Sequence, residues 1–188
     1  MIGYLGLARE TFDVSFAESK FKQGKKALLS ASSKTSGINY LVTNDQLSKN
    51  AFEFFSKKNF SKIIIFQTTF TDAQFILNFS KIINKPICIV AFPESRTGKR
   101  LRLNSVCGLN LGMHSLIKNN IYPDFIIFDT LLNLKKKIRS FILKDNTRNQ
   151  LNKWKQLDGK KIKEKIFIKQ QTIGLIGNRP EGFDTCDY

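Results

Sequence analysis

The chain has 188 residues and a formal net charge of +16, with 31 Lys and Arg against 15 Asp and Glu. A chain of this length can hold one ordinary domain and part of another. Its apolar content of 41% indicates a globular protein and excludes a disordered one. No apolar run approaches the roughly 20 residues that a membrane-spanning helix requires, and the first residues lack the pattern of a secretory signal.

The three cysteines, Cys88, Cys107 and Cys186, are an odd number and show no CxxC spacing. Cys88 lies within the apolar segment PICIVAF, which has the character of a strand. This usage is typical of free thiols in a reducing compartment. We therefore expect a cytoplasmic protein that has no membrane as a partner.

Short apolar runs recur along the chain, and they are rich in β-branched and aromatic residues. They do not alternate with polar residues, which is typical of strands buried on both faces of a sheet. In chain order, the runs are residues 2–7, 38–42, 63–66, 87–92 and 125–128. We predict a strand at each of them.

Between these runs, apolar side chains recur at helical spacing. Leu47, Ala51 and Phe55 form one such stripe, a second begins at Phe75, and a third covers residues 106–117. Strands that alternate with helices predict a parallel sheet covered by helices on both faces, joined by right-handed crossovers. The predicted fold class is thus α/β, a Rossmann-like doubly wound parallel sheet of about five strands over residues 1–142.

The last part of the chain predicts a linker and the opening of a second domain. Residues 143–170 are expected to form a basic helical linker. Residues 171–188 contain IGLIGNRPEGFD, which repeats the pattern of IGYLGLARETFD at residues 2–13. We therefore predict that 171–188 is the truncated start of a second α/β domain, with a sixth strand of the first sheet as the alternative.

The excess of positive charge is concentrated in residues 135–169. Such a segment could be an electrostatic contact for nucleic acid. The alternative is a solvated helical linker in a chain that is generally rich in Lys, Asn, Ile and Phe. No RRM, KH, zinc-finger or helix-turn-helix signature accompanies the charge. We favour the solvated linker and expect no nucleic-acid partner.

The most informative segment is AFPESRTGKRLRLNSVCGLNLGMHSL, residues 91–116, which follows the fourth predicted strand. It has Gly98 for a tight turn, and it carries four basic residues before a helix, namely Arg96, Lys99, Arg100 and Arg102. Ligands of such sheets bind beyond the carboxyl ends of the strands. A hydroxyl-rich or anionic ligand could bind here at the helix N-terminus, and an ordinary surface loop is the alternative.

Other chemical motifs are weaker. Gly3 and Gly6 lie within the first run instead of in a turn after it, so they do not form a dinucleotide-binding fingerprint. His114 is the only histidine and accompanies no nucleophile motif, so no catalytic triad can be built. The sequence assigns no catalytic and no metal-binding residue to this chain.

Four acidic residues lie in the candidate binding loops, namely Glu10, Asp13, Asp72 and Glu94. Each could act as an acid–base group or as a helix cap. For Asp13 and Asp72, which precede predicted helices, we predict capping.

Four segments carry a further signal when they are considered together. They are LARETFDVSFAE at 7–18, TTFTDAQ at 68–74, PESRTGKRLRLNSVCGLNLGMHSL at 93–116 and IGLIGNRPEGFDTCDY at 173–188. Across essentially the whole chain they resemble the N-terminal part of the L-fucose/L-arabinose isomerase-like family. The arginine-rich loop and its LNS–CGxN continuation are the most specific part, although Lys99 stands where a second glycine is expected.

This resemblance implies an aldose–ketose isomerase with an N-terminal α/β domain, a second α/β domain and a C-terminal domain. It implies a divalent metal ion, often Mn²⁺, which polarises the C1 and C2 oxygens of the sugar. The metal ligands belong to the later domains, and no position of this chain corresponds to them. In that family the N-terminal domain helps to form the sugar pocket, commonly of a neighbouring subunit. The resemblance therefore implies that Arg9, Arg96 and Asn104 contact the substrate or shape its pocket.

We therefore expect the chain to be the N-terminal fragment of a sugar isomerase of carbohydrate metabolism, with a sugar as its small-molecule partner. The full-length form is expected to be a homo-oligomer. The fragment itself is expected to be inactive and to hold no cofactor, because the metal-binding domains are absent from it. A stand-alone sugar or sugar-phosphate-binding domain is one alternative. A nucleic-acid-binding protein that acts through the basic linker is the other.

Overall fold

A computed structural model describes residues 1–95, 98 and 100–145. In this part, five strands alternate with five helices. The strands are β1 Ile2–Leu7, β2 Thr35–Val42, β3 Lys62–Gln67, β4 Ile87–Ala91 and β5 Asp124–Ile127. The helices are α1 Val14–Ala31, α2 Asp45–Ser56, α3 Gln74–Ile83, α4 Ser105–Lys118 and α5 Leu131–Leu143.

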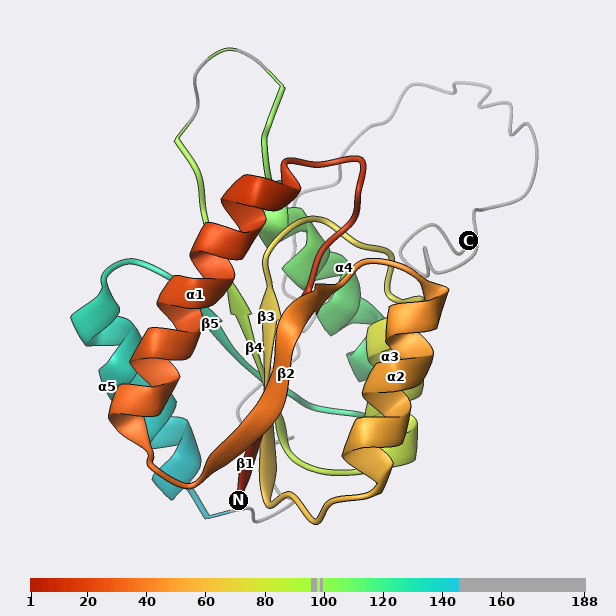
Figure 1. The fold of residues 1–188 in the computed structure, drawn as a ribbon, viewed down its shortest axis with the longest axis vertical. Coiled ribbons are helices and arrows are strands. Elements are labelled where there is room, and N and C mark those ends of the chain that lie inside the picture. Colours follow the sequence, from red (N-terminus) through yellow and green to blue (C-terminus); the bar gives the residue numbers. More distant parts are fainter. Residues whose placement is uncertain (96–97, 99, 146–188) are drawn as a thin grey trace, which may run out of the picture.

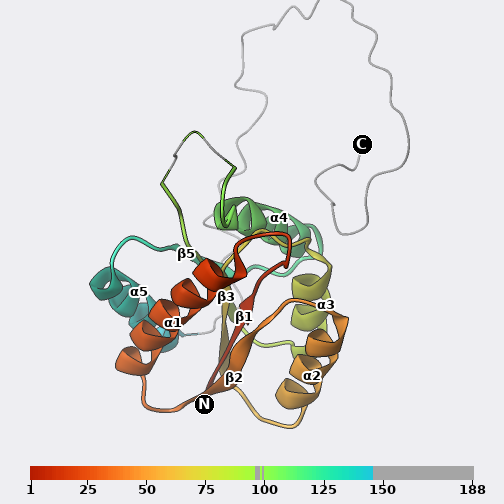
Figure 2. The same cartoon turned by 45° about the horizontal axis from the view of Figure 1, so that its top comes forward.

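The strands form one sheet in the order β2-β1-β3-β4-β5, and every neighbouring pair is parallel. The chain moves from β1 to β2 in one direction and from β3 to β5 in the other, so the winding reverses between β1 and β3. Helices cover both faces, with α1 and α5 on one and α2, α3 and α4 on the other (Figures 1 and 2). The predicted fold class is confirmed.

Each face of the sheet has its own apolar core, because successive strand residues point to opposite faces. On β3, Ile63 and Ile65 belong to the core beneath α2, α3 and α4. Ile64 and Phe66 belong to the core beneath α1 and α5. All of these side chains are buried, which explains why the central strands appear in the sequence as continuous apolar runs.

The strands begin and end within one residue of the predicted apolar runs, except at the start of β2. β2 begins at Thr35, three residues before the predicted run at Ile38. β2 is the edge strand beside β1, and its residues Asn39 and Tyr40 are exposed. An edge strand needs fewer apolar residues, so its polar first half carries no strong sequence signal.

Lys62 joins the start of β3 to the end of α5. Its side chain is 4% exposed, and its ammonium donates hydrogen bonds to the carbonyl oxygens of Phe141 at 2.6 Å, Ile142 at 3.0 Å and Lys144. Carbonyls at a helix C-terminus have no partner within the helix, and Lys62 supplies it. Burial lowers the pKa of Lys62, while the charge of Asp124 acts in the opposite direction.

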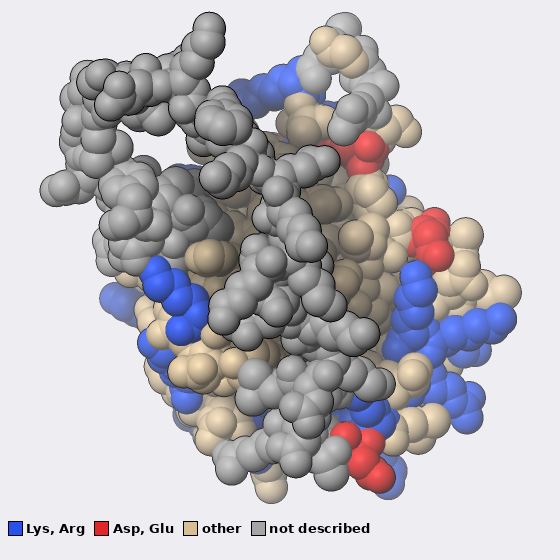
Figure 3. Space-filling model, turned by 180° about the vertical axis from the view of Figure 1, so that it is seen from behind, with Lys and Arg blue, Asp and Glu red and all other residues tan. Residues whose placement is uncertain are grey.

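The predicted linker and second domain lie almost entirely outside the described residues, so these domain boundaries stay predictions. α5 ends at Leu143, next to the predicted boundary at 142. Within the described residues, none of the helices is both long enough and apolar enough to cross a membrane. On the side opposite to the view of Figure 1, the visible Lys and Arg side chains are spread over both flanks and not gathered in one stripe (Figure 3).

Candidate functional site at the carboxyl edge of the sheet

The loops after β1, β3 and β4 are hydrogen-bonded to one another at the carboxyl edge of the sheet. The backbone N–H of Arg9 donates to the Thr69 hydroxyl at 2.8 Å. The N–H of Phe70 donates to the carbonyl of Leu103 at 2.7 Å, and that of Asp13 donates to the carbonyl of Arg102 at 3.0 Å. Three segments that are distant in the sequence therefore form one connected surface.

Glu94 holds the loop between β4 and α4 in shape. Its carboxylate accepts hydrogen bonds from the backbone N–H groups of Arg102 at 2.7 Å, Leu103 at 2.8 Å and Asn104 at 2.6 Å. A carboxylate that accepts three amide hydrogen bonds is strongly held in place. The sequence leaves open an acid–base role and a helix-cap role for Glu94, whereas the geometry supports a different one, that of an acceptor for three backbone amides of the loop.

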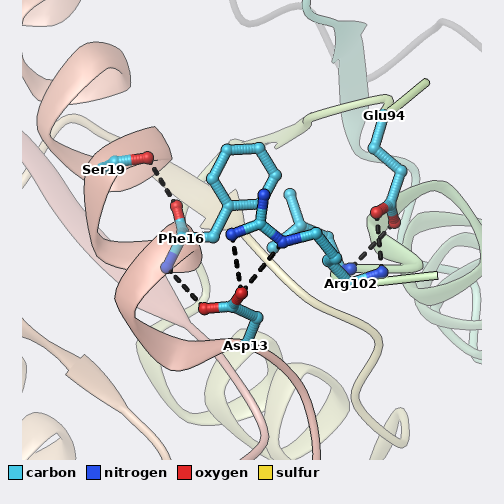
Figure 4. A network of polar contacts seen from close by, with 6 residues as sticks. Asp13, Phe16, Ser19, Glu94 and Arg102 are labelled. Atoms are coloured by element: carbon cyan, nitrogen blue, oxygen red, sulfur yellow. Dashed lines mark hydrogen bonds and ion pairs between the residues drawn. The ribbon is translucent and has the colours of Figure 1, made fainter. Parts of the chain in front are cut away.

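Arg102 links this loop to the start of α1. Its Nε and Nη2 atoms donate to Asp13 Oδ2 at 2.9 and 2.7 Å, and its guanidinium lies 3.9 Å from the centre of the Phe16 ring. Figure 4 shows Arg102 between Asp13 on one side and Glu94 on the other. The guanidinium of Arg102 is thus engaged within the protein.

Asp13 is the N-cap of α1, as predicted, because its Oδ1 accepts from the N–H of Phe16 at 2.9 Å. This hydrogen bond lowers the pKa of Asp13, and the hydrogen bond from Arg102 adds to the effect. Asp72 accepts from the N–H of Gln74 at 3.1 Å, at the start of α3. The capping prediction is thus confirmed for Asp13 but not for Asp72, because the N-cap of α3 is Ala73 and this helix has no side-chain cap.

Arg100 also bonds to another loop of the protein. Its Nη2 donates to the carbonyl of Thr11 at 3.1 Å, and its guanidinium lies 5.8 Å from the centre of the Phe12 ring. Two of the four basic residues in the arginine-rich loop, Arg100 and Arg102, thus fasten that loop to the β1–α1 loop. Arg96 and Lys99 lie outside the described residues.

Asn104 is the N-cap residue of α4, but its side chain makes no capping hydrogen bond. Its φ of 51° lies in the left-handed region, which asparagine tolerates better than most residues. The first residue of the helix is Ser105. Its hydroxyl accepts a hydrogen bond from the N–H of Phe92 at 2.9 Å and donates one to the carbonyl of Gln67. The Asn104 side chain is therefore not used by the helix and is half-buried.

A cavity of about 600 Å³ lies between α2, α3 and the carboxyl ends of β1 and β2. Among its polar lining residues are Arg9, Thr43, Asp45, Lys49, Asp72 and Asn78. Phe52 and Phe75 contribute apolar surface to it, and their ring centres are 5.4 Å apart. Such a position is where open α/β sheets bind ligands.

The charged groups of this cavity differ in how they are compensated. Asp72 has the hydrogen bond from Gln74 described above, and Asp45 lies in the first turn of α2, where the helix dipole favours a negative charge. The side chains of Arg9 and Lys49 make no hydrogen bond or ion pair with the described residues, although Asp45 and Asp72 line the same cavity. Both side chains are exposed, so these two cations are available to a ligand.

The predicted site residues are thus separated. Arg9 lines the cavity, Asn104 lies in the loop network at the start of α4 and is not part of the cavity lining, and Arg96 lies outside the described residues. Lys49 was missed, because a lysine on the polar side of an amphipathic helix has no distinguishing sequence signal. Only the strand order reveals that it lies near Arg9.

In the described part of the chain, we find no cluster of side chains suited to metal or thiol chemistry. Among these residues, no group of three or more His, Cys, Asp or Glu could hold a metal ion. His114 is exposed on α4, and Cys107 is an exposed free thiol. Cys88 is buried in β4, and burial raises the pKa of its thiol well above the usual range.

Comparison with known proteins gives a consistent group of relatives, although no family model matches the chain. It is 23% identical over 180 residues to a sulfoquinovose isomerase of Priestia megaterium and to one of Priestia aryabhattai. It is 24% identical over 183 residues to a sulfoquinovose isomerase of Alkalicoccus urumqiensis. Each match covers 96% of this chain and 37% of the relative.

The chain thus spans a little over a third of the length of the curated relatives that it matches. These relatives are sugar isomerases, which supports the resemblance at that level. The more specific assignment to the L-fucose/L-arabinose isomerase-like family stays a prediction.

Proposed function

We propose that this chain is the N-terminal part of a sugar isomerase that interconverts an aldose and a ketose in carbohydrate metabolism. The observation that carries the proposal is the similarity to sulfoquinovose isomerases along 96% of the chain. The relatives' name makes sulfoquinovose, a sulfonated aldose, the first substrate to test. The connected loops at the carboxyl edge of the sheet support the proposal, because that edge is where such folds bind small molecules.

In this proposal, the chain supplies part of the sugar-binding surface. Arg9 is an exposed donor at the end of β1, and Asn104 presents an amide that its helix does not use. We propose that both contact the sugar, together with Arg96. Their contribution is to bind and orient hydroxyl groups, because a correctly positioned substrate lowers the entropic cost of the reaction.

For the whole enzyme we propose a divalent metal ion, such as Mn²⁺, which would supply Lewis-acid polarisation of the sugar oxygens. The donor set of the described residues does not fit this ion, because they contain no cluster of three ligands. We therefore assign no catalytic step to this chain. Turnover is expected to require the sequence that corresponds to the remaining length of the relatives. We also propose that the whole enzyme is a cytoplasmic homo-oligomer.

The test is activity of the chain extended by its downstream coding sequence. The extended protein is incubated with sulfoquinovose and a panel of neutral aldoses, with and without Mn²⁺, and ketose is detected by ¹³C NMR. We expect ketose from at least one aldose, and none from the 188-residue chain under the same conditions. An extended protein that forms no ketose from any aldose would contradict the proposed function.

A further inference from the structure

The two edges of the sheet differ in the side chains that they carry. β2 forms one edge, and its exposed residues include the polar Asn39. β5 forms the other edge and consists of Asp124 followed by three apolar residues, 125–127. In the described part of the chain, no strand pairs with the outer side of β5. Native proteins usually protect an edge with polar or charged side chains or cover it, so an apolar edge indicates a surface that is covered.

Phe125 and Ile127 leave apolar surface open on the α4 side of the sheet. Their partners on β4, Ile89 and Ala91, belong to the core beneath α2, α3 and α4. Phe125 is nevertheless 47% exposed and Ile127 is 42% exposed. On the opposite face, the intervening Ile126 is buried. The helices on the α4 side therefore leave the outermost strand uncovered.

The same two residues point their backbone groups to the open edge. The N–H of Phe128 donates to the carbonyl of Ala91 on β4 at 2.8 Å. Successive N–H groups along a strand point alternately to its two sides, so those of Ile127 and Phe125 point away from β4. Any strand that is added here must pair through Phe125 and Ile127.

We propose that β5 pairs antiparallel with β5 of a second copy of this chain, about a twofold axis at Ile126. In this register, Phe125 of each copy lies opposite Ile127 of the other, on the same face of a continuous sheet. Opposite residues whose backbone groups face each other exchange both N–H···O=C hydrogen bonds. An aromatic and a β-branched side chain form a favourable cross-strand pair. A twofold interface requires such self-complementarity, and the symmetry of the two exposed residues about Ile126 supplies it.

The solvent-accessible charges at the two ends of β5 are complementary in this arrangement. At the amino end, Asp124 and Asp145 accompany one lysine, Lys144, which pairs with Asp124 at 2.8 Å. Beyond the carboxyl end, Asp129 accompanies the two lysines of 136–137, and Lys137 lies 3.4 Å from it. The twofold axis brings the amino end of each copy beside the carboxyl end of the other. An excess of carboxylate thus meets an excess of lysine.

The later part of the same chain fits this edge less well. α5 lies on the face of α1, whereas α3 and α4, which connect β3 to β4 and β4 to β5, lie on the other face (Figures 1 and 2). A parallel strand added beside β5 after α5 would therefore need a crossover of the opposite, left hand. Such crossovers make up only about 2% of cases. A second copy meets no such restriction.

The strand alone is too short for a strong dimer. Specific interfaces bury about 800 Å² per partner, which is more than the four residues of β5 can offer, so the flanking helices must contribute. Leu131 and Leu132 at the start of α5, just beyond β5, are exposed apolar residues that can do so. We expect a weak dimer that forms as the concentration rises.

The first test is sedimentation velocity of the 188-residue chain over a range of concentrations. The mass should rise from that of a monomer towards that of a dimer. Phe125→Lys should weaken dimerisation at least about tenfold, because it places an ammonium at the centre of a desolvated apolar interface. The matched control is Tyr40→Lys, which changes an exposed residue of the β2 edge and should leave dimerisation unchanged. Both positions are exposed, so the variants should fold, as circular dichroism can verify.

The register is tested by two double variants that change the same positions. Phe125→Lys with Ile127→Glu places a lysine opposite a glutamate at both pairs, whereas Phe125→Lys with Ile127→Lys places lysine opposite lysine. The first should dimerise at least about tenfold more tightly than the second. The difference should shrink as salt is added, because exposed charges are screened.

A chain that stays monomeric at every concentration would overturn the inference, as would a dimer that Phe125→Lys leaves unchanged. Equal dimerisation of the two double variants would also overturn it. So would slow hydrogen exchange at Phe125 and Ile127 in the monomer, since another part of the same chain would then cover β5. None of these measurements needs turnover, so their outcome is independent of the proposed isomerase activity.

Discussion

The carboxyl edge of the sheet presents two regions with cations, and they differ in what surrounds those cations. In the loop between β4 and α4, Arg102 is paired with Asp13 and packed on Phe16, and Arg100 is bonded to the carbonyl of Thr11. In the cavity between α2 and α3, the side chains of Arg9 and Lys49 make no hydrogen bond or ion pair with the described residues, and Asp45 and Asp72 line the same cavity. Several arginines in one loop can therefore serve to hold the loop in place as readily as to bind a ligand.

Glu94→Ala, in the β4–α4 loop, is expected to have the largest effect on stability. The change leaves three backbone N–H groups without their acceptor, so we expect a loss of about 1–3 kcal/mol in the free energy of unfolding. Urea denaturation measures it, and hydrogen exchange should show faster exchange at Leu103 and Asn104. The control Glu94→Gln keeps one oxygen acceptor and should lose less. Equal stability of both variants and the unmodified chain would show that the loop does not depend on Glu94.

A smaller effect is expected from the two arginines that the comparison contrasts. Arg102→Met should lower the melting temperature by a few degrees at most, roughly what a loss below 1 kcal/mol gives in a domain of this size, because it removes an ion pair and a ring contact on the surface. Arg9→Met should leave the melting temperature unchanged, because its side chain has no partner to lose. Scanning calorimetry of both variants measures the difference. If Arg9→Met were the more destabilising, Arg9 would be structural and its proposed role would fail.

The smallest expected effect is a loss of stability at acidic pH, and it should arise only from the β4–α4 region. The N–H of Phe16 and the guanidinium of Arg102 lower the pKa of Asp13 in the folded state. The stabilisation is therefore fully present above the unfolded pKa of about 3.9 and is lost as the pH falls through the lower folded value. Asp13→Asn can still cap α1 but does not titrate. The stability difference between the two proteins should be constant at neutral pH and shrink below about pH 4; a difference that grows on acidification would contradict this account.

The fold could be predicted from the sequence because parallel strands buried on both faces leave unalternating apolar runs. Ile63 to Phe66 in β3 is such a run, and its residues fill two cores. Helix starts were also predictable, because a cap acts within a few residues: Asp13 bonds to Phe16, and Asn44 bonds to the N–H of Leu47 at 3.0 Å.

The site was less predictable, because its contacts join residues far apart in the sequence. Arg102 and Asp13 are 89 positions apart, and no local pattern announces their pairing. The arginines near Gly98 are compatible with a ligand site or with an ordinary surface loop, and the two that the structure describes there bond to the protein. Lys49 resembles any solvent-exposed helical lysine until the strand order places α2 beside the end of β1. Sequence patterns report periodicity and capping well, but they do not report which distant charges compensate one another.

The contact of Lys62 with the end of α5 also determines where the polypeptide leaves this domain. Lys62 is the first residue of β3, and Lys144 pairs with Asp124, the first residue of β5, at 2.8 Å. The exit is thus fastened to the amino ends of the strands, on the side of the sheet opposite to Arg9 and Asn104. The end of α5 and the carboxyl edge of the sheet are therefore separated by the height of the sheet, about 20 Å for a strand of six residues.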